Sequence, residues 1–123
     1  MQLRREGRDA EALKKFEHAY HKRRPSRALA QIALAEQALG RWLRSERHLL
    51  AALQDRKDRW IRDNRAPLQQ SLAQIQNHLV NIEVDVSVAQ AQVLVNGRLI
   101  GTHPLSRPVR AIAGTVIIEV RAE

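Results

Sequence analysis

The sequence predicts an α+β fold, with helix hairpins over residues 1–79 followed by a small antiparallel β-sandwich over residues 80–123. Three observations favour this division. A Gly-Arg pair at Gly7 and again at Gly40 opens two helical patterns that are offset by 33 residues. The hydrophobic period changes from helical to two at Asn81. Residues 1–80 contain 17 Lys and Arg against 9 Asp and Glu, whereas residues 81–123 contain four of each sign.

The two helical patterns repeat the same order of side-chain sizes. A small residue, a large apolar residue and another small residue follow each Gly-Arg pair at the same steps: Ala12, Phe16 and Ala19, then Ser45, Leu49 and Ala52. A period of this length is typical of stacked helix pairs, each of which buries a face only against its neighbours.

Capping and breaking residues divide the region of residues 1–79 into helices. Gly7 is expected to end a first helix, and Asp9 to cap the next, which stops before Pro25. Ser26 is expected to cap a helix that ends at Gly40.

Two further helices are predicted before the period changes. The third covers about residues 42–53, and the residues expected to be buried in it are Trp42, Leu49, Leu50 and Leu53. The fourth covers about residues 58–79 and is expected to break near Asn64. The reason is Pro67, which removes a backbone hydrogen bond and clashes with the preceding turn.

Alternation of apolar and polar residues predicts strands after Asn81. A half-buried strand is expected over residues 82–88, and a second over residues 92–95. Asn96-Gly97 is a strong two-residue hairpin signal, from which a third strand returns at residues 98–100. A short edge strand at residues 108–110 and a last strand at residues 116–120 complete the predicted sandwich.

The composition and motifs exclude several classes of site. The chain has no Cys, so disulfides, thiolate metal sites and Cys nucleophiles are excluded. No Gly-x-Ser-x-Gly, Gly-x-Gly-x-x-Gly or His-Glu-x-x-His motif occurs. His18 and His21 are three residues apart, but the positive Lys22 and Arg23 that follow disfavour a bound cation. We therefore expect no catalytic residue, no metal site and no cofactor.

Two surfaces are candidates for binding a partner. Helix-repeat proteins bind peptides along a concave surface formed by the first helix of each pair. The residues predicted to line that surface are Arg27, Ala30, Leu34, Gln37, Trp60 and Asp63. A basic patch for an acidic partner would consist of Arg23, Arg24, Arg27, Arg59, Arg62 and Arg65. The alternative is a solvated surface on which Arg residues pair with nearby Asp and Glu.

Both regions resemble known families. The first resembles the tetratricopeptide repeat through Gly7, Ala12, Phe16 and Ala19, and again through Gly40, Leu49 and Ala52. The second resembles the PEGA domain of bacterial envelope and surface-associated proteins through residues 93–97, 101–105 and 113–114. Two departures are Ser45, which replaces the usual Ala, and residues 88–91, of which only Ala91 matches the tetrapeptide that names the PEGA family.

The resemblance implies a non-enzymatic protein-interaction scaffold. It also implies that the chain is a fragment of a bacterial envelope protein, with a β domain incomplete at its C-terminal end. As written, the chain has no signal peptide or membrane span and is expected in the cytoplasm, whereas the resemblance places the parent protein in the periplasm or at the cell surface.

Two further expectations stay open. The alternative function is electrostatic binding of nucleic acid or another polyanion by the Arg-rich residues 1–80, although aromatic residues for base stacking are nearly missing. The last strand is also expected at an open sheet edge, which predicts weak self-association by strand addition.

Overall fold

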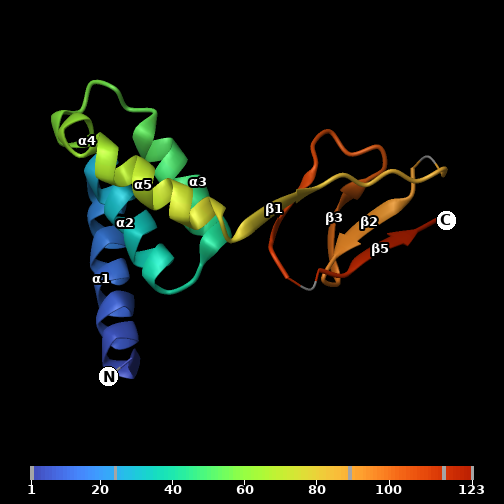
Figure 1. The fold of residues 1–123 in the computed structure, drawn as a ribbon, viewed down its shortest axis with the longest axis horizontal. Helices are drawn as coiled ribbons and strands as arrows, with labels where there is room; N and C mark the ends of the chain where they lie inside the picture. Colours follow the sequence, from blue (N-terminus) through green and yellow to red (C-terminus); the bar gives the residue numbers. More distant parts are fainter. Residues whose placement is uncertain (1, 24, 89, 115, 123) are drawn as a thin grey trace. The chain divides into compact units, whose positions relative to one another are not determined.

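A computed structural model of the chain confirms the predicted α+β class, and it divides into a helical unit (residues 1–78) and a β unit (residues 79–123). It describes residues 2–23, 25–88, 90–114 and 116–122, without the side chains of residues 2–6 and 19–23. The expected boundary fell between residues 79 and 80, one residue later than the observed one. Figure 1 shows the helices of the first unit and the strands of the second.

The helical unit is arranged around its second helix. Its helices are α1 (Gln2–Arg23), α2 (Ser26–Ala38), α3 (Trp42–Leu53), α4 (Arg59–Asp63) and α5 (Arg65–Gln76). Helix α2 packs against α1 and α3 and also touches α4 and α5, while α3 packs against α5 (Figure 1). This central position explains why Ala30 and Ala33 of α2 are completely buried.

Helix α1 corrects the prediction that Gly7 ends a helix. The helix continues through Gly7 and Asp9, so Asp9 is not a cap. An internal Gly costs a helix only about 1 kcal/mol relative to Ala, and the neighbouring residues favour helix, so Gly7 alone does not stop it.

Gly40 ends α2 as predicted. Its φ of +74° is in the left-handed region that Gly adopts without strain. The backbone N–H of Gly40 donates to the carbonyl of Gln37 (3.0 Å), and that of Arg41 donates to the carbonyl of Glu36 (2.9 Å). These two bonds form a Schellman motif, which satisfies the last carbonyls of the helix and turns the chain toward α3.

The break near Asn64 is also confirmed. Helix α4 ends at Asp63 and α5 begins at Arg65, with Asn64 outside helical geometry at φ −109° and ψ 11°. Pro67 therefore lies in the first turn of α5, where its missing N–H would have no intrahelical partner. The helix ends at Gln76, however, and not at Leu79, which starts a strand.

Asp55 ties the loop after α3 to the start of α2. The Ser26 hydroxyl donates to Asp55 Oδ2 (2.6 Å), and the backbone N–H groups of Lys57 and Asp58 donate to Oδ1 (both 3.2 Å). The prediction that Ser26 caps α2 is wrong. Ser26 is the first residue of this helix, and Pro25 is its N-cap. The hydrogen bond from Ser26, followed by those from the backbone, lowers the pKa of the Asp55 carboxyl.

Replacing Ser26 by Ala is expected to raise the pKa of Asp55 toward its ordinary value and to lower the stability of the helical unit at neutral pH. Because the folded-state pKa is lowered, the stabilisation is complete above the unfolded value of about 3.9 and is lost as the pH falls through the folded value. Melting temperatures of the parent chain and of Ser26→Ala, measured from neutral pH to about pH 2, should therefore converge in acid. A difference that is independent of pH would contradict this assignment.

The core of the helical unit confirms that Leu49 and Leu53 are buried, whereas Trp42 is half-buried and Leu50 is exposed. Leu49, Ile61 and Ile75 are completely buried. A second cluster of Leu13, Ile32 and Ala35 lies between α1 and α2 and is extended by Phe16 and Leu39. Leu50, predicted to be buried, is 41% exposed, because its side chain lies beyond the face of α3 that α2 and α5 cover.

The β unit contains two small antiparallel sheets. Strand β1 (Leu79–Ile82) pairs with β4 (Val109–Ile112). Strand β2 (Gln92–Val95) pairs with β3 (Arg98–Thr102) on one side and with β5 (Ile118–Arg121) on the other. The predicted strand over residues 82–88 is wrong in extent: residues 83–86 alternate in polarity, but in the described part of the chain no strand pairs with them.

The predicted hairpin turn is confirmed. Asn96 (φ +51°) and Gly97 (φ +81°) both have left-handed backbones, as a two-residue turn between twisted strands requires. The two neighbouring residues Val93 and Leu94 are both buried although their side chains point to opposite faces. Strand β2 is therefore covered on both faces and is the centre of this unit.

Candidate functional site

The predicted concave surface is partly occupied by contacts within the chain. The guanidinium of Arg27 lies over the ring of Trp60, 5.3 Å from its centroid, which is a cation–π geometry. The side-chain amide of Gln37 donates to Gln74 (3.3 Å). The structure thus brings Arg27 and Trp60 together, and the two side chains contact each other.

The prediction that Ala30 lines this concave surface is wrong. Ala30 is completely buried, because α2 is enclosed by its neighbours at this position, so Ala30 cannot touch a peptide. Leu34 is half-buried, and Asp63 is exposed with its carboxylate 3.7 Å from the guanidinium of Arg59. A peptide on this surface would have to displace existing contacts.

Several members of the predicted basic patch make contacts within the chain. Arg24 and the side chain of Arg23 lie outside the described residues. Arg65 is half-buried and donates to the carbonyl of Leu53 (3.0 Å), which ties α5 to α3. Arg27 and Arg59 make the contacts given above. Arg62 of α4 is exposed, and no contact is described for it.

A different recess lies among α1, α2 and α3. This pocket, named here the α1–α3 pocket, has a volume of about 300 Å³. Its lining residues are Glu17, Leu29, Ile32, Glu36, Arg44, Arg47 and His48. The volume is at the lower limit of pockets that hold small ligands, and it is large enough to receive one or two side chains of a partner.

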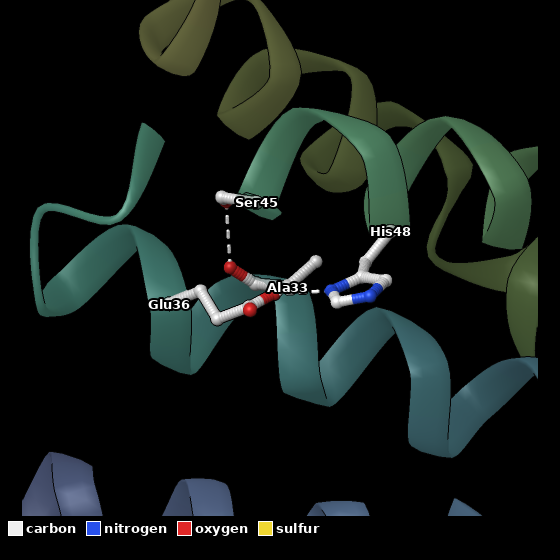
Figure 2. Close-up of polar contacts among 4 residues, drawn as sticks. All are labelled: Ala33, Glu36, Ser45 and His48. Atoms are coloured by element: carbon white, nitrogen blue, oxygen red, sulfur yellow. Dashed lines mark hydrogen bonds and ion pairs between the residues drawn. The ribbon is translucent and has the colours of Figure 1, made fainter. Parts of the chain in front are cut away.

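A buried acid and a histidine form one wall of the α1–α3 pocket. Glu36 is only 3% exposed, and its Oε1 lies 2.5 Å from Nδ1 of His48. A carboxylate can only accept, so Nδ1 of His48 donates this bond. Figure 2 shows the pair reaching from α2 to α3, beside the Ser45 hydroxyl that donates to the carbonyl of Ala33 (2.7 Å). His48 is therefore held in one orientation, with its other ring nitrogen left for a further contact.

The remaining walls combine apolar surface with positive charge. Ile32 is buried and Leu29 half-buried, so α2 supplies an apolar floor. Arg44 and Arg47 of α3 are exposed at the rim, opposite Glu17 of α1. Glu36 is buried and accepts from His48, so at the exposed rim the two cations face one acid, Glu17. The arrangement favours a group that carries a carboxylate next to an apolar chain.

Sequence reasoning did not identify this pocket as a site. Glu36 lies at helical spacing from the apolar Ile32, Ala33 and Leu39, and an acid buried on such a face needs a partner. That signal does not name the partner, because His48 is 12 residues away on the next helix. Only the packing of α2 against α3 brings the two residues together.

The described residues contain neither a metal site nor a membrane-spanning helix. Within them, no three His, Asp or Glu side chains gather as a metal ion would require. In the same residues, every helix is too short or too polar to cross a bilayer. Neither protein-family models, nor curated proteins, nor solved structures match this chain. The resemblance to tetratricopeptide repeats and PEGA domains thus stays a prediction.

Proposed function

We propose that the helical unit is a non-enzymatic protein-interaction scaffold that binds an acidic segment of a partner protein. The observation that carries the proposal is the α1–α3 pocket, which joins an apolar floor, two rim cations and an oriented histidine. The resemblance to tetratricopeptide repeats supports the same function. The resemblance of the β unit to PEGA domains supports a place for this scaffold in a bacterial envelope-associated protein.

Each part of the α1–α3 pocket would recognise one feature of the partner. An aliphatic side chain such as Leu would cover Leu29 and Ile32, and a neighbouring carboxylate would accept from Arg44 or Arg47. The excess of Lys and Arg in residues 1–80 would steer acidic segments toward this unit over longer distances. Affinity should therefore depend on both the acid and the apolar side chain.

Replacing Arg44 or Arg47 by Glu is expected to weaken binding of acidic, Leu-containing peptides about tenfold or more, because a charge-assisted bond becomes a repulsion. Fluorescence anisotropy would be measured with a labelled peptide library built on Glu-Leu pairs and with its Gln-Leu counterpart. Arg62→Glu is the matched control, since it makes the same charge change on α4, away from the pocket.

Two results would contradict the proposal. One is equal binding of the Glu-Leu and Gln-Leu libraries. The other is an effect of Arg62→Glu as large as that of Arg47→Glu, which would mean that net charge and not the α1–α3 pocket determines binding.

The second candidate function is electrostatic binding of nucleic acid or another polyanion. It is favoured by the concentration of the net charge of +8 in residues 1–80. It is disfavoured by the two Trp rings, because Trp42 stacks on His78 with centroids 3.7 Å apart and Trp60 is covered by Arg27. A base that stacked on either of these ring faces would displace the side chain already there. Binding of single- and double-stranded oligonucleotides that falls steeply with salt, and exceeds peptide binding, would favour this candidate.

A further inference from the structure

Strand β5 lies at an edge of its sheet. The strand order is β3-β2-β5, so in the described part of the chain β5 is paired only with β2 (Figure 1). An edge strand presents backbone N–H and C=O groups that another strand can bond, unless charges or bulges prevent it.

The hydrogen bonds at the start of β5 show which backbone groups point outward. The N–H of Asn96 donates to the carbonyl of Ile117 (2.8 Å), and the N–H of Ile117 donates to Oδ1 of Asn96 (3.0 Å). Both backbone groups of Ile117 therefore point toward the β2 side. Because the direction alternates from residue to residue, Glu119 and Arg121 bond toward β2, and the groups of Ile118 and Val120 point away from it.

The side chains on β5 do not block this edge. Glu119 and Arg121 lie on the same face, one on each side of Val120, and the Arg121 guanidinium donates to the Glu119 carboxylate. Their charges cancel, so the edge has no net charge at its centre. Val120 is 38% exposed and Ile117 is 63% exposed, so a neighbouring strand would also cover apolar surface.

We propose that two copies of this chain associate by antiparallel pairing of their β5 strands about a twofold axis at Val120. In this register each Val120 lies opposite the Val120 of the second copy, and their outward N–H and C=O groups exchange two hydrogen bonds. Each Glu119 then lies opposite an Arg121 of the second copy, and each Arg121 opposite a Glu119. The two three-stranded sheets join into one of six strands with an isologous interface.

The order of charges is what selects a second copy as the partner. An acid and a base placed symmetrically about Val120 are complementary to themselves when the strand is reversed, and opposite charges directly across an antiparallel pair are stabilising. A strand from another protein would need the same order of charges to fit as well. This inference concerns the β unit and is independent of the peptide-binding function proposed for the helical unit.

Charge reversal tests the register directly. Glu119→Arg leaves two positive side chains and Arg121→Glu leaves two negative ones, so either variant alone places like charges opposite each other. Each is expected to raise the dissociation constant about tenfold or more. A mixture of the two variants should restore association as a heterodimer, and the double variant E119R/R121E should associate as the parent chain does.

Sedimentation velocity over a wide concentration range would measure these dissociation constants on the full chain. Far-UV circular dichroism would show that each variant is folded. Arg98→Glu is the matched control, since it makes the same charge change as R121E on β3, at the opposite edge of the sheet. It is expected to leave the dissociation constant unchanged.

The outcomes separate this interface from its alternatives. A parent chain that is monomeric at all concentrations would overturn the proposal. So would association that is insensitive to E119R, or a mixture of E119R and R121E that does not recover it. Loss of association in R98E but not in R121E would place the contact at β3.

Discussion

Replacing Leu49 by Ala is expected to lower the free energy of unfolding of the helical unit by about 2–5 kcal/mol. Leu49 is completely buried on α3, the helix that packs against both α2 and α5. The shorter side chain removes apolar contacts and leaves a cavity that helices fixed by several neighbours cannot close fully. Urea denaturation followed by far-UV circular dichroism would measure the loss.

The neighbouring Leu50 provides the control for this prediction. It has the same chemistry and lies on the same helix but is 41% exposed, so Leu50→Ala is expected to cost about 1 kcal/mol or less. Equal losses for the two variants would mean that the packing of α3 differs from the one described. This pair is informative because the sequence predicts both residues to be buried.

Replacing Val93 by Asp is expected to destabilise the β unit by about 3–5 kcal/mol, enough to unfold so small a unit. Val93 is completely buried on the central strand β2, and the structure offers no cation beside it among its register partners Gly101 and Val120. A carboxylate there would lose its hydration without gaining a partner. The dispersion of amide signals of β2, β3 and β5 in NMR spectra would report the loss.

Leu99→Asp is the matched control, because it places the same carboxylate on the adjacent strand β3 at a side chain that is 53% exposed. It is expected to keep the β unit folded, since the charge remains in water. Retained signal dispersion in Val93→Asp would contradict the assignment of β2 as the buried centre of the sheet.

Local signals in the sequence predicted several elements well. The limits of α3, the break at Asn64, the end of α2 at Gly40 and the turn at Asn96-Gly97 are all confirmed. Each depends on backbone conformations that one or two residues impose on their immediate neighbours. Such effects operate within a few residues of the chain, so they can be recognised without any knowledge of tertiary contacts.

Gly7 and residues 83–86 show where local signals were insufficient. Gly7 permits a helix end but does not require one, and the helix around it continued. Residues 83–86 have the alternation of a strand, but a strand forms only where another strand lies beside it to accept its hydrogen bonds.

By itself, the sequence determined the α+β class, the order of most elements and the separation of the positive charge from the β region. Tertiary structure alone decided which side of each element is covered: Ala30 is buried, Leu50 is exposed, and Glu36 meets His48. It also decided that β5 is an edge strand whose charges pair with each other. The physical reason is that burial and pairing depend on residues from other elements, whose positions are fixed only when the elements pack.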